Sequence, residues 1–372
     1  MRIVIDARMW QQSGIGRYLR NLIFHLQILD KENEYFILHL IEDYNTAQYQ
    51  KNFHKVLSDF KWYGLIEQRR LPKMLNDLRP DLVHFPNFNV PIFYAGKFVV
   101  TIHDLIHQHY SMKRATTLDP FIYKLKQFGY KKVFGFAIKR SCAIFTPTNF
   151  VRDQLINEWE VSSEKIKVTY EAVDDKIISL AKDITEKQSQ EFLVKFKIRK
   201  PYIFYVGNAH PHKNIEGLIR VFLKFKERYK GLRLVLSGND HFFWQRLKAK
   251  FREKEIIFTG FVTDLAMVSL YKKAKAFVMP SFEEGFGLPV LEAMASGTPV
   301  TCSNIAVLKE IGLGACLYFN PNSFKDMSDK IGLIITDEKL ASRLIEKGQA
   351  RYKQFSWEKL ARETLLSYNS CA

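Results

Sequence analysis

The stretch PSFEEGFGLPVLEAMASGTPV, Pro280 to Val300, contains a glycine-rich turn between two segments of different periodicity. AFVMPS, which leads into it, is typical of a buried strand, and PVLEAMAS is typical of a helix. Pro289 then lies near the first helical position, where its fixed φ is favourable and its missing N–H is not needed. The N–H groups around Gly287 and Leu288 point out of the helix end, where the helix dipole is positive. The turn therefore predicts an anion site such as one for phosphate.

Two glutamates flank this turn. Glu292, one turn into the helix, can accept hydrogen bonds from a vicinal diol such as a ribose, and Glu284 on the loop can do the same for another polyol. A phosphate between two hydroxyl-bearing groups describes a nucleotide sugar. The alternative is an ordinary helix N-terminus with acids that complement the dipole and a tight packing contact, and one motif does not separate the two.

Strand-like and helix-like segments alternate through the rest of the chain. Short β-branched runs such as RIVIDA, FVVTIHD and KIKVTYEAV are separated by helical stretches up to about residue 180. The alternation of strand-like and helix-like segments begins again at YIFYVGN, after residue 200. This pattern predicts an α/β fold with two doubly wound, Rossmann-like domains, residues 1–185 and 186–355, and ligands at the carboxyl ends of the strands. A ligand lying in a cleft between the two domains is expected.

Composition narrows the class of protein. The 372 residues carry 56 Lys and Arg against 39 Asp and Glu, a formal charge of +17, which favours phosphate-bearing partners. The four cysteines show no CxxC spacing, so neither metal nor disulfide roles are expected, and a reducing cytoplasm fits. RIVIDARM at the start reads as a strand and not as a leader, and no apolar run approaches the ~20 residues that span a bilayer.

Two further loops follow predicted strands. In YVGNAHPHKN, Gly207 ends a strand and Lys213 precedes a helix, so the lysine can reach a phosphate at a neighbouring strand end. In SGIGR, near the N-terminus, a loop can bring the backbone of Gly14 and Gly16 close to a pyrophosphate. That second motif lacks the third glycine of the dinucleotide-binding pattern. Histidines 210 and 212 are interpreted as surface residues.

Taken together, these motifs resemble glycosyltransferase family 4, whose members have the two-domain GT-B fold. The resemblance is strongest over VGNAHPHKN and over the E-x7-E motif, Glu284-GFGLPVL-Glu292. It implies that Glu292 holds the ribose, that Glu284 contacts the transferred sugar and that Lys213 neutralises the leaving diphosphate. It also implies that the last helix, residues 356–372, packs on the first domain. Further residues that it assigns to the site are His103 of the IHD segment, facing the sugar, and, around the donor, Gly14, Gly16, Arg17, Gly207, Asn208, Phe286, Gly287 and Leu288.

One position departs from the pattern of this family. Many members have an arginine directly after VG, where this chain has Asn208. The charge of the phosphates is then expected to be met by Lys213 and by Arg17 or other groups of the first domain.

The expected mechanism needs no metal and no cofactor. No D-x-D pair occurs in the sequence, and a lysine with a helix N-terminus can take over the electrostatic role of a cation. No carboxylate is evidently placed as a covalent nucleophile. The resemblance implies retention of anomeric configuration, with the leaving phosphate as the base.

The resemblance favours a hexosyltransferase, with mannose from GDP-mannose as the expected donor and a glycan or lipid-linked acceptor in the synthesis of O-antigen or related surface polysaccharides. Transferases that use UDP-hexoses or UDP-N-acetylhexosamines are close alternatives, and a sugar-nucleotide epimerase is a weaker one. A phosphorylase is weaker still. A non-enzymic protein that binds nucleic acid is disfavoured, because acids placed to bind polyols repel a phosphate backbone.

Residues 121–140, FIYKLKQFGYKKVFGFAIKR, predict a helix that docks on the inner face of the cytoplasmic membrane. Its expected core stripe contains Phe128, Val133 and Phe136, together with Phe121 and Leu125. The expected outer face contains Tyr123, Tyr130 and Phe134, flanked by Lys124 and Lys131 and near Lys126. Aromatic side chains beside lysines are typical of helices at anionic lipid surfaces. The alternative is a helix buried on both faces with solvated lysines at its edges.

Overall fold

The computed structural model describes residues 1–109, 120–239 and 241–371, with the side chains of residues 120–126 left out. The chain forms two compact units, one of residues Met1–Glu171 with Ser356–Ala372 and the other of Ala172–Phe355. The division thus falls earlier than the boundary at 185/186 expected from the sequence. The reason is that residues Asp175–Asp183 form a helix that packs on two helices of the second unit, where Lys176 also pairs with Asp264 at 2.9 Å and Lys272 Nζ donates to the carbonyl of Ala181 at 2.8 Å.

The first unit contains a seven-stranded sheet in the order β3-β2-β1-β4-β5-β6-β7. All of its strand pairs are parallel, so the carboxyl ends of the strands lie along one edge, and the strand order changes direction between β1 and β4. Every residue of β4 and β5 is buried, as expected for strands covered on both faces. The strands are β1 (Arg2–Asp6), β2 (Glu34–His39), β3 (Phe53–Leu57), β4 (Leu82–Phe85), β5 (Phe98–Thr101), β6 (Ile144–Thr146) and β7 (Ile166–Val168).

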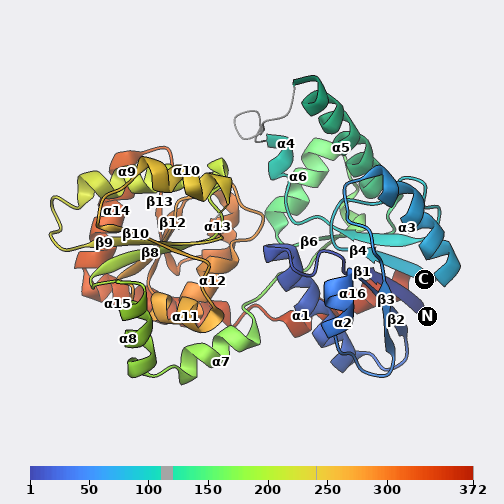
Figure 1. Cartoon of the computed structure of the whole chain (residues 1–372), viewed down its shortest axis with the longest axis horizontal. Coiled ribbons are helices and arrows are strands. Elements are labelled where there is room, and N and C mark those ends of the chain that lie inside the picture. The colour runs from blue at the N-terminus through green and yellow to red at the C-terminus, as the bar shows by residue number, and fades with distance from the viewer. Residues whose placement is uncertain (110–119, 240, 372) are drawn as a thin grey trace. The chain divides into compact units, whose positions relative to one another are not determined.

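Helices cover both faces of this sheet (Figure 1). On one face α1 packs against α16, and on the other a core of Leu71, Phe134, Val151 and their neighbours joins α3, α5 and α6 to the strands. The helices of this unit are α1 (Ser13–Leu29), α2 (Ile41–Thr46), α3 (Leu65–Leu78), α4 (Ile106–His109), α5 (Pro120–Arg140), α6 (Asn149–Trp159) and α16 (Trp357–Cys371), with a short 3₁₀ turn at Ser163–Lys165.

The last helix, α16, is tied to the first unit by buried side chains. Trp357 lies edge-on to Tyr18 of α1, with ring centroids 6.4 Å apart. The Tyr368 hydroxyl hydrogen-bonds His84 Nδ1 at 2.5 Å, and His84 Nε2 contacts Thr101 Oγ1 at 2.8 Å. Complete burial lowers the pKa of His84 to about 3, so this histidine is neutral and serves the packing of α16.

The expectation that the cysteines form no disulfide is wrong. Cys142, two residues after the end of α5, is bonded to Cys371 at the end of α16, with Cα atoms 5.9 Å apart. The two residues are 229 positions apart in sequence, and only the docking of α16 brings them together. Spacing along the chain therefore gave no signal of this pair. Cys302 and Cys316 are free and buried.

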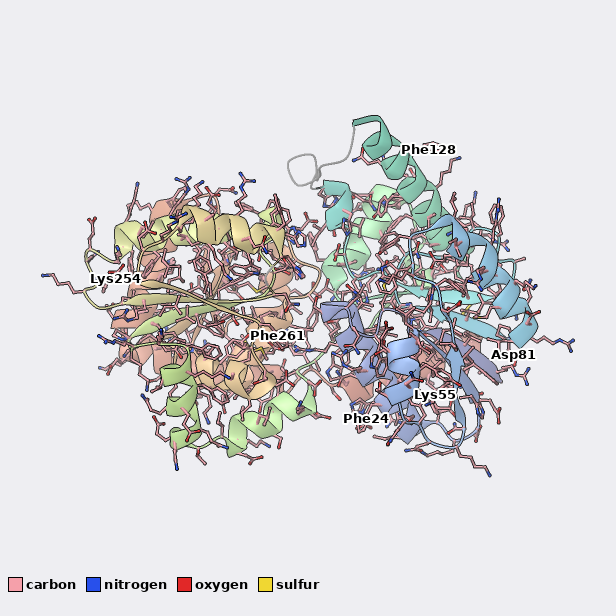
Figure 2. The ribbon with its side chains drawn as sticks, viewed as in Figure 1. Phe24, Lys55, Asp81, Phe128, Lys254 and Phe261 are labelled. Carbon is pink, nitrogen blue, oxygen red and sulfur yellow. A yellow bond between two sulfur atoms is a disulfide. The ribbon has the colours of Figure 1, made fainter. Side chains whose placement is uncertain are left out.

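The orientation predicted for α5 is wrong in part. Phe136, expected in the core, does stack on Phe98 at 6.1 Å. Phe134, expected on the outer face, is fully buried against Phe88 and Trp159, whereas Phe128, expected in the core, is 60% exposed. Figure 2 shows Phe128 at the surface of α5. Tyr130 is half-buried and contacts Phe88. Because aromatic residues occur on two opposite sides of this helix, its periodicity did not determine which face packs against the sheet. The side chains of Phe121, Tyr123, Lys124, Leu125 and Lys126 lie outside the described residues.

The second unit contains a six-stranded parallel sheet in the order β10-β9-β8-β11-β12-β13. The strand order again changes direction in the middle of the sheet, between β8 and β11. The strands are β8 (Tyr202–Val206), β9 (Arg233–Ser237), β10 (Ile256–Gly260), β11 (Ala276–Met279), β12 (Val300–Ser303) and β13 (Cys316–Phe319).

Helices lie on both faces of this second sheet as well (Figure 1). α9 packs against α14, and α12 packs against α15. The helices are α7 (Asp175–Asp183), α8 (Glu186–Lys195), α9 (Ile215–Phe225), α10 (Phe242–Lys250), α11 (Asp264–Lys273), α12 (Leu288–Ala295), α13 (Ala306–Gly312), α14 (Phe324–Thr336) and α15 (Glu338–Tyr352), with a 3₁₀ turn η3 at Pro211–Lys213. In the part of the chain that the structure describes, no helix combines the length and the apolar character needed to cross a bilayer.

Candidate active site

The loops after β8 and β11 meet at the carboxyl edge of the second sheet. β8 and β11 are neighbouring parallel strands, paired at Ile203 and Ala276. Phe282 N donates to the carbonyl of His212 at 2.7 Å, and Asn214 Nδ2 donates to the carbonyl of Pro280 at 3.1 Å. These bonds join the two loops directly, so Lys213 on one and Glu284 on the other are brought within reach.

Glu284 forms a short ion pair with Lys213. Lys213 Nζ lies 2.6 Å from Glu284 Oε2, and Ser281 Oγ donates to Glu284 Oε1 at 2.6 Å. The side chains are only 6% and 14% exposed for the glutamate and the lysine, so each charge depends on its partner. Each carboxylate oxygen already accepts one hydrogen bond and has a second lone pair left. The arrangement fixes the orientation of Glu284 and keeps acceptor capacity for a ligand.

Glu292 lies in α12 and is 2% exposed. The Tyr271 hydroxyl, from α11, lies 3.1 Å from Glu292 Oε2 and 3.2 Å from the carbonyl of Pro289. Tyr271 is itself fully buried, which makes it a rigid support for the carboxylate.

The N-terminus of α12 has the form predicted from the sequence. Its cap is Gly287, with φ at +100°, a residue that has no side chain with which to cap the helix. The first turn contains a proline and no acid. A Cβ on Gly287 would be strained at this φ and would lie 2.7 Å from Leu308 Cδ2. Phe286, before the cap, is buried edge-on to Phe355 at 5.9 Å.

Gly207 and Asn208 shape the turn after β8. Gly207 has φ at +151°, and its N–H donates to the carbonyl of Ser237 at 3.0 Å. The carbonyl of Asn208 accepts from the Tyr205 hydroxyl at 2.7 Å, and its side-chain oxygen accepts from His210 N at 3.3 Å. Burial and the neighbouring charge of Glu284 raise the pKa of Tyr205 well above its usual range, so this phenol remains a neutral donor.

In the first unit, Gly14, Gly16 and Arg17 form the first turn of α1 and not the loop expected from the sequence. Gly16 N donates to the carbonyl of Gln12, and a Cβ on Gly16 would come within 2.1 Å of the Trp10 carbonyl oxygen. Gly16 is therefore required for packing, whereas a Cβ on Gly14 would meet open space. The N-terminus of α1, like that of α12, has no side-chain cap and no acid in its first turn.

His103 lies after β5 at the carboxyl edge of the first sheet. Its Nδ1 is 3.1 Å from Glu171 Oε1, and its Nε2 is 3.0 Å from the carbonyl oxygen of Pro86. The Tyr18 ring lies edge-on to the imidazole at 5.0 Å. The side chain of His103 is 18% exposed, which leaves part of the ring open to a ligand.

Three side chains that contact the predicted residues were missed from the sequence. Ser281 lies inside the opening motif, three positions before Glu284, and Tyr271 lies on a separate helix. Glu171 lies within the predicted strand KIKVTYEAV, two positions before its end, so an acid near a strand end was the available signal. Neither Ser281 nor Tyr271 has a spacing that indicates its partner.

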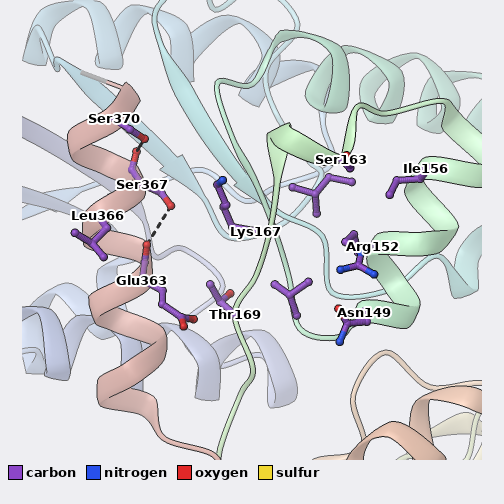
Figure 3. A pocket seen from close by; sticks show the side chains of 12 residues that line it. Asn149, Arg152, Ile156, Ser163, Lys167, Thr169, Glu363, Leu366, Ser367 and Ser370 are labelled. Carbon is purple, nitrogen blue, oxygen red and sulfur yellow. Dashed lines mark hydrogen bonds between the residues drawn. The ribbon is translucent and has the colours of Figure 1, made fainter.

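A pocket of about 690 Å³ lies elsewhere in the first unit, between α6, the edge strand β7 and α16 (Figure 3). On its α16 side Ser367 Oγ donates to the carbonyl of Glu363 at 3.0 Å and Ser370 Oγ to the carbonyl of Ser367 at 2.9 Å. Lys167 of β7 and Arg152 of α6 also line it. Its lining, within the described residues, includes none of the side chains predicted for the site, so we do not count it as part of that site.

Comparison with known proteins identifies the class. The model of glycosyl transferases group 1 matches residues 186–351, and the model of Glycosyltransferase Family 4 matches residues 12–176. Together the two models match most of the chain, which therefore belongs to the group 1 and family 4 glycosyltransferases. The resemblance seen in the sequence is confirmed, and the protein is a glycosyltransferase.

Individual relatives agree with this class. O-antigen chain mannosyltransferase B of Escherichia coli is 28% identical over 384 residues, which cover 96% of each chain. O-antigen chain mannosyltransferase RfbU of Salmonella typhimurium is 31% identical over 234 residues, which cover 62% of this chain and 59% of that protein.

Solved structures confirm the predicted GT-B fold. Sucrose-phosphate synthase of Thermosynechococcus elongatus superimposes with a TM-score of 0.77 at 17% identity, covering 100% of this chain and 98% of that chain. Anabaena HepE in complex with UDP-glucose superimposes with a TM-score of 0.76 at 15% identity, covering 100% of both chains. At these identities the likeness establishes the fold alone.

Proposed function

We propose that this glycosyltransferase transfers mannose from GDP-mannose, with retention, to a glycan or lipid-linked acceptor in O-antigen or related surface-polysaccharide synthesis. The observation that carries the proposal is the Lys213–Glu284 pair beside the uncapped N-terminus of α12, with Glu292 inside the same helix. The sugar is inferred from the two O-antigen mannosyltransferases among the relatives. Transfer from UDP-hexoses or UDP-N-acetylhexosamines remains the alternative that the experiment below separates.

In the proposed complex the diphosphate binds at the N-terminus of α12. The N–H groups near Gly287 and Leu288, together with the ammonium of Lys213, neutralise the negative charge that develops on the leaving phosphate. Gly207 and Asn208 let the backbone after β8 approach the donor, and Phe286 supports the turn before α12. Gly14, Gly16 and Arg17 at the start of α1 contribute a second helix end and a cation. Glu292 accepts hydrogen bonds from the ribose hydroxyls, and Glu284 accepts them from hydroxyls of the sugar.

The pairing of Glu284 with Lys213 and Ser281 favours a binding role over a nucleophilic one. A carboxylate held by an ammonium and a hydroxyl at 2.6 Å is a weakened nucleophile, but it remains a good acceptor. We infer that the leaving phosphate takes the proton of the acceptor hydroxyl as the new bond forms on the face that the diphosphate leaves. His103 faces the sugar from the first unit.

The donor is tested by calorimetric titration with GDP-mannose, UDP-glucose and UDP-N-acetylglucosamine, followed by transfer assays with each donor. We expect the tightest binding and the fastest transfer with GDP-mannose. Tighter binding and faster transfer with a UDP-sugar would replace the proposed donor. Incubation of the donor without an acceptor should give slow hydrolysis at most, whereas an isomerised donor would identify an epimerase.

The same assay tests whether a metal ion is needed. Because Lys213 and the end of α12 take the place of a cation, we expect the initial rate with EDTA to lie within about twofold of the rate of the untreated enzyme. Loss of a preorganised donor, by comparison, lowers the rate by about 100-fold. Loss of activity with EDTA that manganese or magnesium restores would contradict this part of the mechanism.

We also propose that the enzyme works at the inner face of the cytoplasmic membrane, where a lipid-linked acceptor would be presented. The support is an apolar patch on the first unit that differs from the surface expected for residues 121–140. It consists of side chains around the start of α3 and in the loop after β4, namely Tyr63 (56% exposed), Leu65 (85%), Ile66 (63%), Ile92 and Phe93 (71%).

A hydrogen bond and ring contacts join the segments of this patch. The N–H of Ile92 donates to Gln68 Oε1 of α3 at 2.8 Å. The Tyr63 ring stacks on Phe88 at 5.9 Å, and Phe88 lies edge-on to Tyr130 of α5 at 4.8 Å. Arg69 and Arg70 follow on α3, and on α5 Lys132 lies over the ring of the exposed Phe128 at 5.4 Å. Exposed apolar side chains with cations on the same helices are typical of surfaces that bind anionic lipid.

Co-sedimentation with vesicles tests this location. Wild-type protein is expected to bind vesicles that contain anionic lipid and to bind neutral vesicles weakly. The triple variant Leu65→Ser, Ile66→Ser and Phe93→Ser should bind at least about tenfold more weakly, because each large apolar side chain contributes about 1.5–3 kcal/mol when buried. Phe24→Ser, at an exposed phenylalanine of α1, is the control. Equal binding of a folded triple variant and the wild type would exclude this patch as the docking surface.

A further inference from the structure

We propose that Glu171 is a positioning residue that holds the imidazole of His103 for the transfer reaction. This inference rests on the role proposed above for His103. Glu171 was assigned no role from the sequence, and it is the last residue of the first unit.

The geometry of three strand ends supports this role. His103 follows β5, Pro86 follows β4 and Glu171 follows β7, so residues from three strands of one sheet meet at its carboxyl edge. Glu171 Oε1 lies 3.1 Å from His103 Nδ1, and the carbonyl oxygen of Pro86 lies 3.0 Å from Nε2. Both ring nitrogens are thereby engaged, which fixes the plane and the rotation of the ring.

The two partners differ in what a mutation can test. The carbonyl of Pro86 belongs to the backbone and cannot be removed by mutation, whereas the carboxylate of Glu171 is a side-chain partner that can be. The Tyr18 ring packs edge-on at 5.0 Å and limits movement on a further side.

The burial of Glu171 points the same way. The residue is 6% exposed, and among the described residues His103 is the hydrogen-bonding partner that the structure shows for its carboxylate. A buried carboxylate usually has a defined structural or functional partner, because burial without one is unfavourable. The exposed part of the His103 ring is the part that can contact the sugar.

The test is a double-mutant cycle on the transfer reaction with the full chain. Glu171→Ala is expected to lower kcat by about 10- to 100-fold, the equivalent of a hydrogen bond to a charged group, with little change in KM for the donor. Glu171→Gln, which keeps an acceptor oxygen at the same place, should recover part of this loss. In the His103→Ala background, Glu171→Ala should have little further effect, because its partner is already absent.

Controls separate positioning from stability. Asp30→Asn removes the charge of another buried carboxylate of this unit, one that binds Tyr35 and Asn33, and should change thermal stability without changing kcat. Thermal unfolding of each Glu171 variant shows whether it remains folded at the assay temperature. The inference about Glu171 would be overturned if the losses in kcat of the two single variants added in the double variant. It would also be overturned if Glu171→Ala were fully active while His103→Ala was slow. Neither result would contradict the proposed function. Full activity of His103→Ala would instead remove the proposed role of His103.

Discussion

Lys213→Ala is expected to lower kcat by about 100- to 1000-fold, the effect that removal of one preorganised charge-stabilising group has in other enzymes. Two consequences add together. The leaving diphosphate loses the ammonium that neutralises it, and Glu284, which is 6% exposed, loses the charge partner that lies 2.6 Å away. Steady-state kinetics with a saturating donor measures this effect directly.

Controls for this prediction follow from the pair itself. Lys213→Arg keeps the charge, but the planar guanidinium cannot occupy the same point, so we expect partial activity. Glu284→Gln keeps the shape of the carboxylate and should also slow kcat while the donor still binds. If Lys213→Ala retained the wild-type kcat, the assignment of the diphosphate to this end of the sheet would have to be abandoned.

Glu292→Ala is expected to weaken the binding of the nucleotide donor by about 100-fold, since hydrogen bonds to a charged group contribute about 1.5–3 kcal/mol each. Its carboxylate is proposed to accept from two ribose hydroxyls, and alanine accepts from neither. The dissociation constants of GDP and GDP-mannose, measured by calorimetry, should rise by the same factor, because both contain the ribose.

Tyr271→Phe is the matched variant for this second prediction. It removes the hydroxyl that contacts Glu292 at 3.1 Å but leaves the carboxylate in place, so donor binding should weaken by less than in Glu292→Ala. In Glu292→Ala the Tyr271 hydroxyl still has the carbonyl of Pro289 as a partner, which limits the loss of stability. Unchanged GDP affinity in a folded Glu292→Ala protein would refute the ribose assignment.

The architecture was predictable because its strands, helices and turns depend on residues that are neighbours in the sequence. Apolar runs of four or five residues separated by amphipathic helices predict parallel strands, and both sheets are parallel in the structure. The α12 turn was equally local, since Gly287 and Pro289 constrain their own backbone conformations wherever they occur. The break in strand signals between residues 180 and 200 was also correctly seen, although it contains the end of α7 and the whole of α8 and lies within the second unit.

The site was only partly predictable. Glu284 and Glu292 are marked by their spacing around the turn, and Lys213 by its position after a strand. Their supports are not marked, because Ser281, Tyr271 and Glu171 act through contacts that the sequence does not encode at any fixed spacing. Tyr271 lies 21 positions before Glu292, and Glu171 lies 68 positions after His103.

The sequence by itself indicated the alternation of strands and helices, the turn at α12 and the family, because each depends on residues that are close together in the chain. Only the tertiary structure decided which side of α5 is buried, since packing against Phe88 and Trp159 selects Phe134 over Phe128. Only the docking of α16 decided that Cys142 meets Cys371, and only the alignment of β8 with β11 decided that Lys213 pairs with Glu284. The physical reason is the same in each case: parallel strands and a returning helix bring together residues that are distant in sequence, and periodicity records which residues are apolar but not what they pack against.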